Sequence, residues 1–149
     1  MALHIRVDTS NVSEYLAKFG SNLQRKTVEA MRISLRDVRE RARKNHRFTT
    51  RTGDAERSID ASDVKVNGTS VSGEVGTTRE ITVYLHQGTK PHDILPRKKT
   101  VLRWNNGSEF IFARRVHHPG TKEDPFIFNA IDVEEPTIVS RFDHIIDSL

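Results

Sequence analysis

The chain has 149 residues, no cysteine and a formal net charge of +4 at neutral pH. The lack of cysteine excludes disulfide bonds and thiolate metal sites. No stretch reaches the roughly 20 apolar residues of a membrane span, and the first ten residues, MALHIRVDTS, lack the apolar run of a signal peptide. We therefore expect a single domain, residues 1–149, that folds in a reducing cytoplasm.

The first predicted element is a long amphipathic helix from about residue 11 to residue 45. Residues suited to a packed face recur there at intervals of three or four, which aligns them along one side of a helix. They are Val12, Leu16, Phe19, Leu23, Thr27, Met31, Leu35, Val38 and Ala42. Such a helix is on the order of 50 Å long, and Gly20-Ser21 marks a weak point where we expect a kink or a break.

A turn and a short helical piece are predicted in residues 49–59, TTRTGDAERSI. Gly53 permits the backbone conformation of a tight turn. Asp54, directly after it, is a residue type that caps helix starts, because its carboxylate accepts hydrogen bonds from free amides there. We therefore expect Asp54 to cap a short helix.

Alternating residues then predict an antiparallel sheet from about residue 63 to residue 116. Residues 63–75, DVKVNGTSVSGEV, form the first predicted hairpin. Its Asn67-Gly68 pair tolerates the positive φ that a tight primed turn requires at both central positions. A third strand is predicted where apolar residues alternate at Ile81, Val83 and Leu85.

A second hairpin is predicted after an exposed loop. Residues 88–99, GTKPHDILPRKK, are basic and aperiodic, which indicates a loop. Leu102 and Trp104 alternate before a polar turn, and Phe110 and Phe112 alternate after it. We expect the three aromatic residues to be largely buried, within the monomer or at a contact between subunits.

A C-terminal helical region is predicted from about residue 125 to residue 148. Asp124-Pro125 supplies the cap and the pre-set φ of a helix start, and Pro136 is expected to break or restart the helix. Phe126, in its first turn, is expected to be buried like the aromatic residues of the second hairpin. The order helix, antiparallel strands, helix places the chain in the α+β class.

Charge is unevenly distributed along the chain. Between Arg25 and Arg51 there are ten basic and three acidic residues, a net charge of +7. Between Thr121 and Leu149 there are two basic and seven acidic residues, a net charge of −5. Such asymmetry indicates a nucleic-acid partner or a complementary protein surface, although a solvated helix face is the more common explanation of a charge run.

Residues 116–126, VHHPGTKEDPF, invite comparison with a metal site or a catalytic loop. His117 and His118 are neighbours on a predicted strand, so they point to opposite faces and are poorly placed to bind one ion. A site combining His92, Asp93 and one of them matches no known ligand spacing. The chain also has no G-x-S-x-G elbow, no partnered nucleophile and no phosphate-binding glycine loop. We therefore expect no metal, no cofactor and no enzymatic activity.

The same loop is short and stiff. Pro119-Gly120 makes a sharp turn and Asp124-Pro125 starts a helix, with only three residues between them. A stiff loop loses little conformational entropy on binding, which suits an assembly contact. The alternative is that the loop only ends a strand and starts a helix.

Four stretches form an ordered pattern that points to a family. Thr52-Gly53 leads to Arg57-Ser58-Ile59, followed by YLHQGT (84–89), PHDILPRKKTVLRW (91–104) and VHHPGTKEDPF (116–126). Together they resemble the motifs of small tail-completion proteins of long-tailed bacteriophages, also called head–tail joining or minor tail proteins. The resemblance covers about residues 51–132, with a C-terminal helix beginning near Ala130.

The resemblance implies a structural virion protein of the phage neck or tail. Such a protein completes the tail end and supports head–tail joining as part of a homo-oligomeric ring, with six-fold symmetry, around the DNA channel. The implied partners are further copies of the chain, the tail terminator, tube and head-closure proteins, and duplex DNA passing through the lumen. The resemblance implies no membrane partner. The implied location is the virion, and the host cytoplasm during assembly.

In a ring, the basic helix of one subunit can meet the acidic C-terminal region of the next. The predicted pairing joins three arginines to three acids: Arg36, Arg39, Arg43, Glu134, Glu135 and Asp143. The remaining candidate interface residues come from the two loop motifs: His92, Ile94, His117, His118, Pro119, Gly120, Thr121, Lys122 and Phe126. Within one subunit, the two charged regions can instead simply pack together.

The alternative function is stand-alone nucleic-acid binding through the basic N-terminal helix. Several of its arginines fall on one side at helical spacing, and phosphate neutralisation by them would weaken with added salt. They are Arg25, Arg32, Arg36, Arg39 and Arg43. Apart from its start, however, the segment lacks aromatic residues for base stacking, and it contains no recognition motif.

Overall fold

A computed structural model describes residues 10–148, which contain four helices and eight strands. In chain order these are α1 (Ser10–Lys44), α2 (Asp54–Ser58), β1 (Ile59–Ala61), β2 (Lys65–Asn67), β3 (Ser70–Ser72), β4 (Val75–Thr77), α3 (Glu80–Gln87), β5 (His92–Ile94), β6 (Leu102–Asn105), β7 (Phe110–Ala113), β8 (Val116–His118) and α4 (Phe126–Asp147). The predicted α+β class is confirmed. Residues 1–9, on which the expectation about a signal peptide rests, lie outside the described part.

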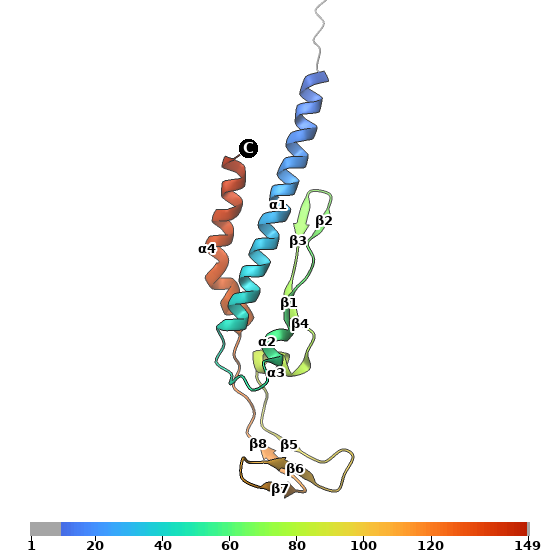
Figure 1. Cartoon of the computed structure of the whole chain (residues 1–149), viewed down its shortest axis with the longest axis vertical. Helices are drawn as coiled ribbons and strands as arrows, with labels where there is room; N and C mark the ends of the chain where they lie inside the picture. The colour runs from blue at the N-terminus through green and yellow to red at the C-terminus, as the bar shows by residue number, and fades with distance from the viewer. Residues whose placement is uncertain (1–9, 149) are drawn as a thin grey trace, which may run out of the picture.

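The two long helices, α1 and α4, lie side by side and form the body of the molecule (Figure 1). Their polar contacts show that they run antiparallel. Lys26 Nζ donates to the carbonyl oxygen of Ser148 at 3.0 Å, and Arg41 Nε donates to Glu134 at 2.5 Å. Small side chains such as Ala30 are buried, which allows close approach of the helices. Both helices match the predicted ranges within a residue or two.

Neither expected interruption breaks its helix. α1 is continuous through Gly20-Ser21, and the Ser21 hydroxyl donates to the Lys18 carbonyl at 2.9 Å. Pro136 lies inside α4 without ending it. The expected break was wrong because proline removes one amide donor, while contacts with α1 on both sides of it hold α4 in place. Of the helices in residues 10–148, none has the length and hydrophobicity needed to cross a lipid bilayer.

The strands do not form the single sheet expected over residues 63–116. They form four separate two-stranded antiparallel sheets, in which β1 pairs with β4, β2 with β3, β5 with β8 and β6 with β7. The β2–β3 pair lies between β1 and β4 in the chain, and the β6–β7 pair lies between β5 and β8, so the four pairs make two long ribbons. One ribbon runs along α1 and the other lies beyond the end of the body (Figure 1). Each strand has three or four residues and pairs with only one neighbour. A two-stranded ribbon of this kind is marginally stable by itself, so it depends on packing against other elements or other molecules.

The first hairpin is confirmed, but its turn lies one residue later than predicted. Asn67 pairs with Ser70, so the turn residues are Gly68 and Thr69. Gly68 has a φ of 59°, and every positive φ among the described residues belongs to a glycine. Asn67 therefore keeps an extended strand conformation, and the turn needs only one left-handed residue.

The predicted third strand is wrong, because residues 80–87 form helix α3. Thr82 is fully buried and its hydroxyl lies 2.8 Å from that of Ser58. Leu85, three residues later, packs against the core, whereas Ile81 is exposed. Burial thus follows the helical period rather than the alternation of apolar residues, and tertiary contacts override the strand propensity of the segment.

The core lies where α1, β1 and the start of α4 meet. It consists of Val38, Ala42, Ile59, Phe126 and Ala130, with Phe48, Val75, Leu85, Ile127 and Ile138 packed against it. Phe126 is completely buried, as predicted. It joins the loop that follows β8 to the centre of the body.

The two carboxylates predicted to cap helices have other partners. Gly53, with a φ of 72°, makes the predicted turn and itself occupies the cap position of α2. The Asp54 carboxylate instead accepts a hydrogen bond from Arg57. Asp124 is buried and accepts a hydrogen bond from the Arg47 backbone amide at 2.5 Å. Asp124 therefore ties the segment after α1 to the start of α4.

Candidate functional site

Residues 90–119 form an arm that extends from the end of the body away from the C-terminus (Figure 1). The β5–β8 pair forms its base and the β6–β7 hairpin forms its tip. The chain enters the arm at Gly88-Thr89 and leaves it at Gly120-Thr121, and we call these four residues the neck. The arm contains most of the loop residues predicted to form an interface.

The neck is held by backbone pairing and by two glycines. Thr89 and Thr121 each donate an amide hydrogen bond to the other's carbonyl oxygen, at 2.8 and 3.1 Å. Gly88 and Gly120 have φ values of 73° and 90°, which residues with a side chain rarely adopt. A Cβ on Gly120 would lie 2.3 Å from the Thr89 carbonyl oxygen. Residues 88–89 and 120–121 therefore pass so close to each other that there is no room for a side chain at Gly120.

Side chains from β5 and β8 pair across both faces of the arm's base. The His92 ring stacks on that of His118, with their centroids 5.1 Å apart. On the opposite face, His117 Nδ1 lies 3.0 Å from a carboxylate oxygen of Asp93. Ile94 continues the register opposite β8 and is exposed. The two adjacent histidines thus point to opposite faces, as predicted from strand geometry.

The polar cluster at the base is an ion-pair network. Hydrogen bonds from His117, and then from Arg115, hold the pKa of the Asp93 carboxyl below its ordinary value. Arg115 already places a cation on this carboxylate. Among the side chains that the structure describes, no three His, Asp or Glu residues are grouped to hold a metal ion. Because Asp93 lies on β5 and its two partners lie on or next to β8, the network stabilises the pairing of these strands.

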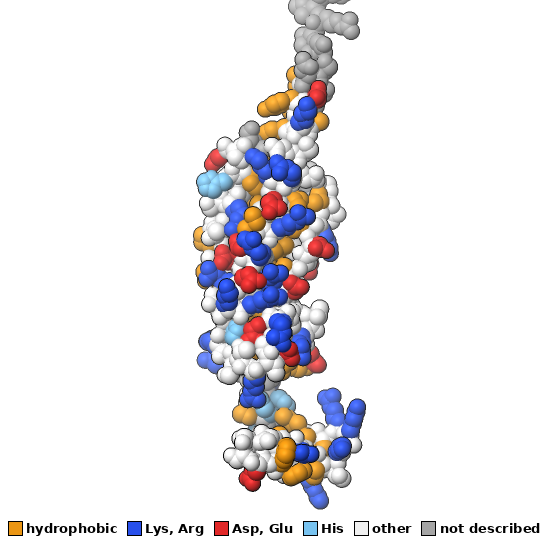
Figure 2. All heavy atoms as spheres, viewed as in Figure 1, with side chains coloured by type: hydrophobic (Ala, Val, Ile, Leu, Met, Phe, Trp, Pro, Cys, Tyr) orange, Lys and Arg blue, Asp and Glu red, His pale blue; other side chains and the backbone are white. Residues whose placement is uncertain are grey.

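The tip of the arm presents hydrophobic and basic side chains to solvent (Figure 2). Phe110 and Phe112 are 52% and 61% exposed, and Trp104, on the other face of the hairpin, is 39% exposed. The guanidinium carbon of Arg103 lies 3.8 Å from the centre of the Phe110 ring. Burial of these three aromatic residues within the monomer is wrong, because none of the elements in residues 10–148 covers them. Burial at a contact between subunits stays a prediction.

Two of the three arginines predicted to reach a neighbouring subunit are engaged within the chain. Arg39 pairs with Asp60 at 3.3 Å, and Arg43 donates to the Ile59 carbonyl oxygen at 2.6 Å. Arg36 is exposed, and within residues 10–148 its only ionic partner is its sequence neighbour, Asp37. Arg39 and Arg43 of α1 thus help to hold the first ribbon against the body.

The predicted acidic partners divide in the same way. Glu134 is buried and pairs with Arg41 of its own chain. Glu135 and Asp143 are exposed. At the Arg41–Glu134 contact, the basic and acidic regions therefore pack together within one chain.

The other loop residues also have distinct positions. Pro119 and Lys122 are exposed on either side of the neck, and Gly120 and Thr121 form half of it. Phe126 lies in the core rather than on a surface. The loop therefore ends strand β8, closes the neck and anchors the start of α4. Most of its residues thus have a role within their own chain.

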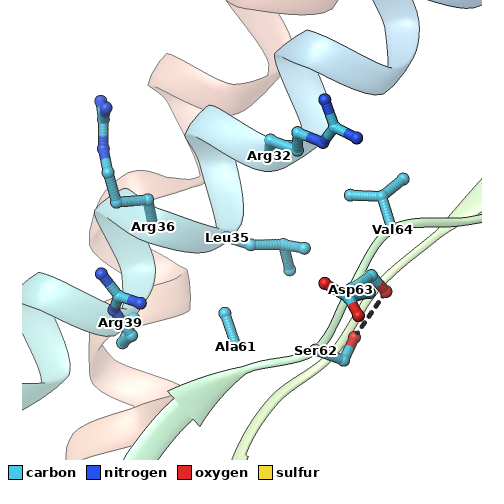
Figure 3. Close-up of a pocket in the computed structure, with 8 residues that line it drawn as sticks. All are labelled: Arg32, Leu35, Arg36, Arg39, Ala61, Ser62, Asp63 and Val64. Atoms are coloured by element: carbon cyan, nitrogen blue, oxygen red, sulfur yellow. Dashed lines mark hydrogen bonds between the residues drawn. The ribbon is translucent and has the colours of Figure 1, made fainter.

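A hollow of about 420 Å³ lies between α1 and the link from β1 to β2 (Figure 3). Arg32, Arg36 and Arg39 line its α1 side, and Leu35 lies between that helix and the link. Asp63 lies on the opposite wall. The hollow contains no nucleophile paired with a base, and its chemistry is that of arginine stems around an apolar side chain.

His86, next to the neck, gives a pH-dependent prediction. Burial lowers the pKa of its imidazole, with a weaker opposing effect of Asp124, and its ring packs edge-on against Phe126 and Phe128. A depressed pKa means that the neutral ring stabilises the fold above the unfolded pKa of about 6.5, and that this stability is lost as pH falls through the folded pKa.

We therefore expect the wild-type urea midpoint to fall, relative to that of His86→Leu, as pH is lowered from 7.5 to 5. His144→Leu, on the exposed side of α4, controls for the loss of one histidine and should follow the wild type. A difference between wild type and His86→Leu that is independent of pH would contradict the prediction.

The neck is the part of the site that sequence reasoning missed. Its dipeptide, Gly-Thr, occurs at residues 88–89 and 120–121, but also at 68–69 and 76–77, so it does not identify the neck by itself. The pairing of the two segments becomes visible only in the fold. Comparison of the chain with family models, curated protein sequences and solved structures finds no match.

Proposed function

We propose that the chain is a structural virion protein of a bacteriophage neck or tail, which completes the tail end and supports head–tail joining within a ring around the DNA channel. The observation that carries the proposal is that two motifs of the phage resemblance, which are far apart in the sequence, meet in the neck. The Gly-Thr of YLHQGT pairs with the Gly-Thr of VHHPGTKEDPF in the neck. The second motif then ends at Phe126, in the core.

The arm between these motifs supports an assembly role. A two-stranded ribbon is marginal in water by itself, and its tip exposes Phe110 and Phe112 to solvent. Contiguous exposed apolar surface bordered by charge is typical of protein contacts. A rigid neck places such a surface at a fixed position relative to the body, as repeated contacts in a ring require.

The proposed partners are further copies of the chain, in a ring with six-fold symmetry, and neighbouring tail terminator, tube and head-closure proteins. Duplex DNA passes through the lumen, and the finished protein resides in the virion. The alternative, stand-alone nucleic-acid binding by α1, has less support. Arg39, Arg41 and Arg43 contact groups of their own chain and are less available to phosphates.

The test is a phage whose gene for this chain carries an early stop codon. We expect DNA-filled heads and full-length tails that remain separate in electron micrographs, with loss of infectivity. Supplying the wild-type chain from a plasmid should restore joined particles. Normal joining and normal titre without the chain would show that the proposed role is wrong.

A further inference from the structure

The arm carries positive charge that is not balanced within the chain. Residues 90–119 contain seven basic and two acidic residues, a net charge of +5. In the described part of the chain, Arg115 is the only one of the seven in an ion pair, with Asp93. Arg97, Lys98, Lys99 and Arg103 are exposed. Figure 2 shows the basic side chains of the arm bordering its hydrophobic ones.

The outer side of α4 carries the opposite charge. Phe128, Asp132, Glu135, Val139 and Asp143 follow one another at intervals of three or four, so they lie along one side of the helix. All five are exposed, and we call them the α4 stripe. Across residues 10–148, no ion pair involves the three carboxylates of the stripe, although those of Asp37 and Glu134 are paired.

The two surfaces match in chemistry as well as in charge. The outer face of the tip combines Arg103 with Phe110 and Phe112. The stripe combines two apolar side chains with three carboxylates along roughly four turns. Aromatic side chains give large buried areas, and bordering charges fix orientation and speed encounter. The arginines of α1 also carry charge opposite to that of the stripe, but Arg39, Arg41 and Arg43 already have partners in their own chain.

One chain does not bring its own two surfaces together. The tip lies beyond the neck, away from the body, whereas the stripe runs along α4 towards the C-terminus (Figure 1). A contact between two arms or between two stripes would place like charges together. We infer that the tip of the arm docks on the α4 stripe of a second copy of this chain. Such a head-to-tail contact generates a ring or a filament; the inference gives the subunit contact of the proposed ring and rests on that function.

The test is a charge exchange in the purified full-length chain, followed by sedimentation at low salt. The arm variant is Lys98→Glu, Lys99→Glu, Arg103→Glu, and the stripe variant is Asp132→Lys, Glu135→Lys, Asp143→Lys. We expect the wild type to self-associate and each variant alone to associate at least about tenfold more weakly. A matched control with the same charge change away from the arm, Lys44→Glu, Arg51→Glu, Lys65→Glu, should associate like the wild type.

Mixing the two variants is the decisive measurement. In an alternating assembly, an acidic arm meets a basic stripe, and a basic arm meets an acidic stripe, so association should return. All six substitutions in one chain should also restore it. Because the chain has no cysteine, Phe112→Cys mixed with Val139→Cys should give disulfide-linked dimers, whereas Phe112→Cys with Val66→Cys should not.

The contact is wrong if the wild type stays monomeric at every concentration, or if the mixture stays dissociated. Retention of duplex DNA by the wild type, lost in the arm variant and without self-association, would assign the arm to nucleic acid and also overturn the inference. The experiment with the stop-codon phage tests the proposed function separately from this contact. A contact in solution combined with normal head–tail joining in the absence of the chain would refute the proposed function alone.

Discussion

Replacement of Phe126 by alanine is expected to lower the free energy of unfolding by about 3–5 kcal/mol, the usual cost of removing a buried aromatic ring. Phe126 is completely buried, and its ring packs against those of Phe48 and His86 with centroids 5.4 and 5.1 Å apart. A domain of this size has a total stability of about 5–15 kcal/mol. A loss of this size therefore removes a large part of the total.

The matched control is Phe128→Ala, two residues later in the same helix. Phe128 is 61% exposed, so its replacement is expected to change stability by less than about 1 kcal/mol. Urea denaturation followed by circular dichroism measures both variants. Equal losses would show that burial at Phe126 does not hold the first turn of α4 to the body. Because Phe128 belongs to the α4 stripe, the control variant is also expected to weaken self-association.

Substitution of Gly120 by alanine is expected to open the neck, whereas the same substitution at Gly107 should leave it closed. Both glycines have a positive φ, 90° and 102°, so each substitution introduces backbone strain of about 1–3 kcal/mol. They differ in what the new Cβ meets. At Gly107 no atom lies within 4 Å, but at Gly120 the nearest atom is the Thr89 carbonyl oxygen, at 2.3 Å.

Backbone must move at Gly120, and the hydrogen bonds between Thr89 and Thr121 are the nearest to break. We expect amide hydrogen exchange at these two residues to accelerate at least about tenfold in Gly120→Ala. Exchange in α1 and α4 should change little, since the helix pair has its own contacts. Protection of the neck in Gly120→Ala equal to that in Gly107→Ala would contradict the role given to this glycine.

The sequence by itself was sufficient for the elements with a long repeating signal. The stripe from Val12 to Ala42 repeats over many turns, so the range of α1 was predictable without knowledge of its partner. Gly53 and Gly68 likewise marked turns, since few other residues adopt a positive φ. Burial of Phe126 was predicted from its aromatic side chain at the start of the helical region, whereas Phe128 in the same turn is exposed, so the helical register was needed to tell the two apart.

Short segments were decided by tertiary structure. Residues 80–87 alternate like a strand, yet the buried hydroxyl contact of Thr82 and the packing of Leu85 select a helix. A pattern of eight residues contains too few repeats to distinguish the two periods. The same holds for the sheet, because alternation predicts strands but not which strands pair.

Exposure and charge pairing were also beyond the sequence. Trp104, Phe110 and Phe112 have the alternation of a buried hairpin, but a pattern identifies the apolar residues of an element and not whether anything covers them. Arg39 and Arg43 looked available to a partner, yet the fold brings Asp60 and the Ile59 carbonyl to them. Charges far apart in sequence meet only through the arrangement of the elements, so tertiary structure alone decided which are engaged and which remain on the arm and the α4 stripe.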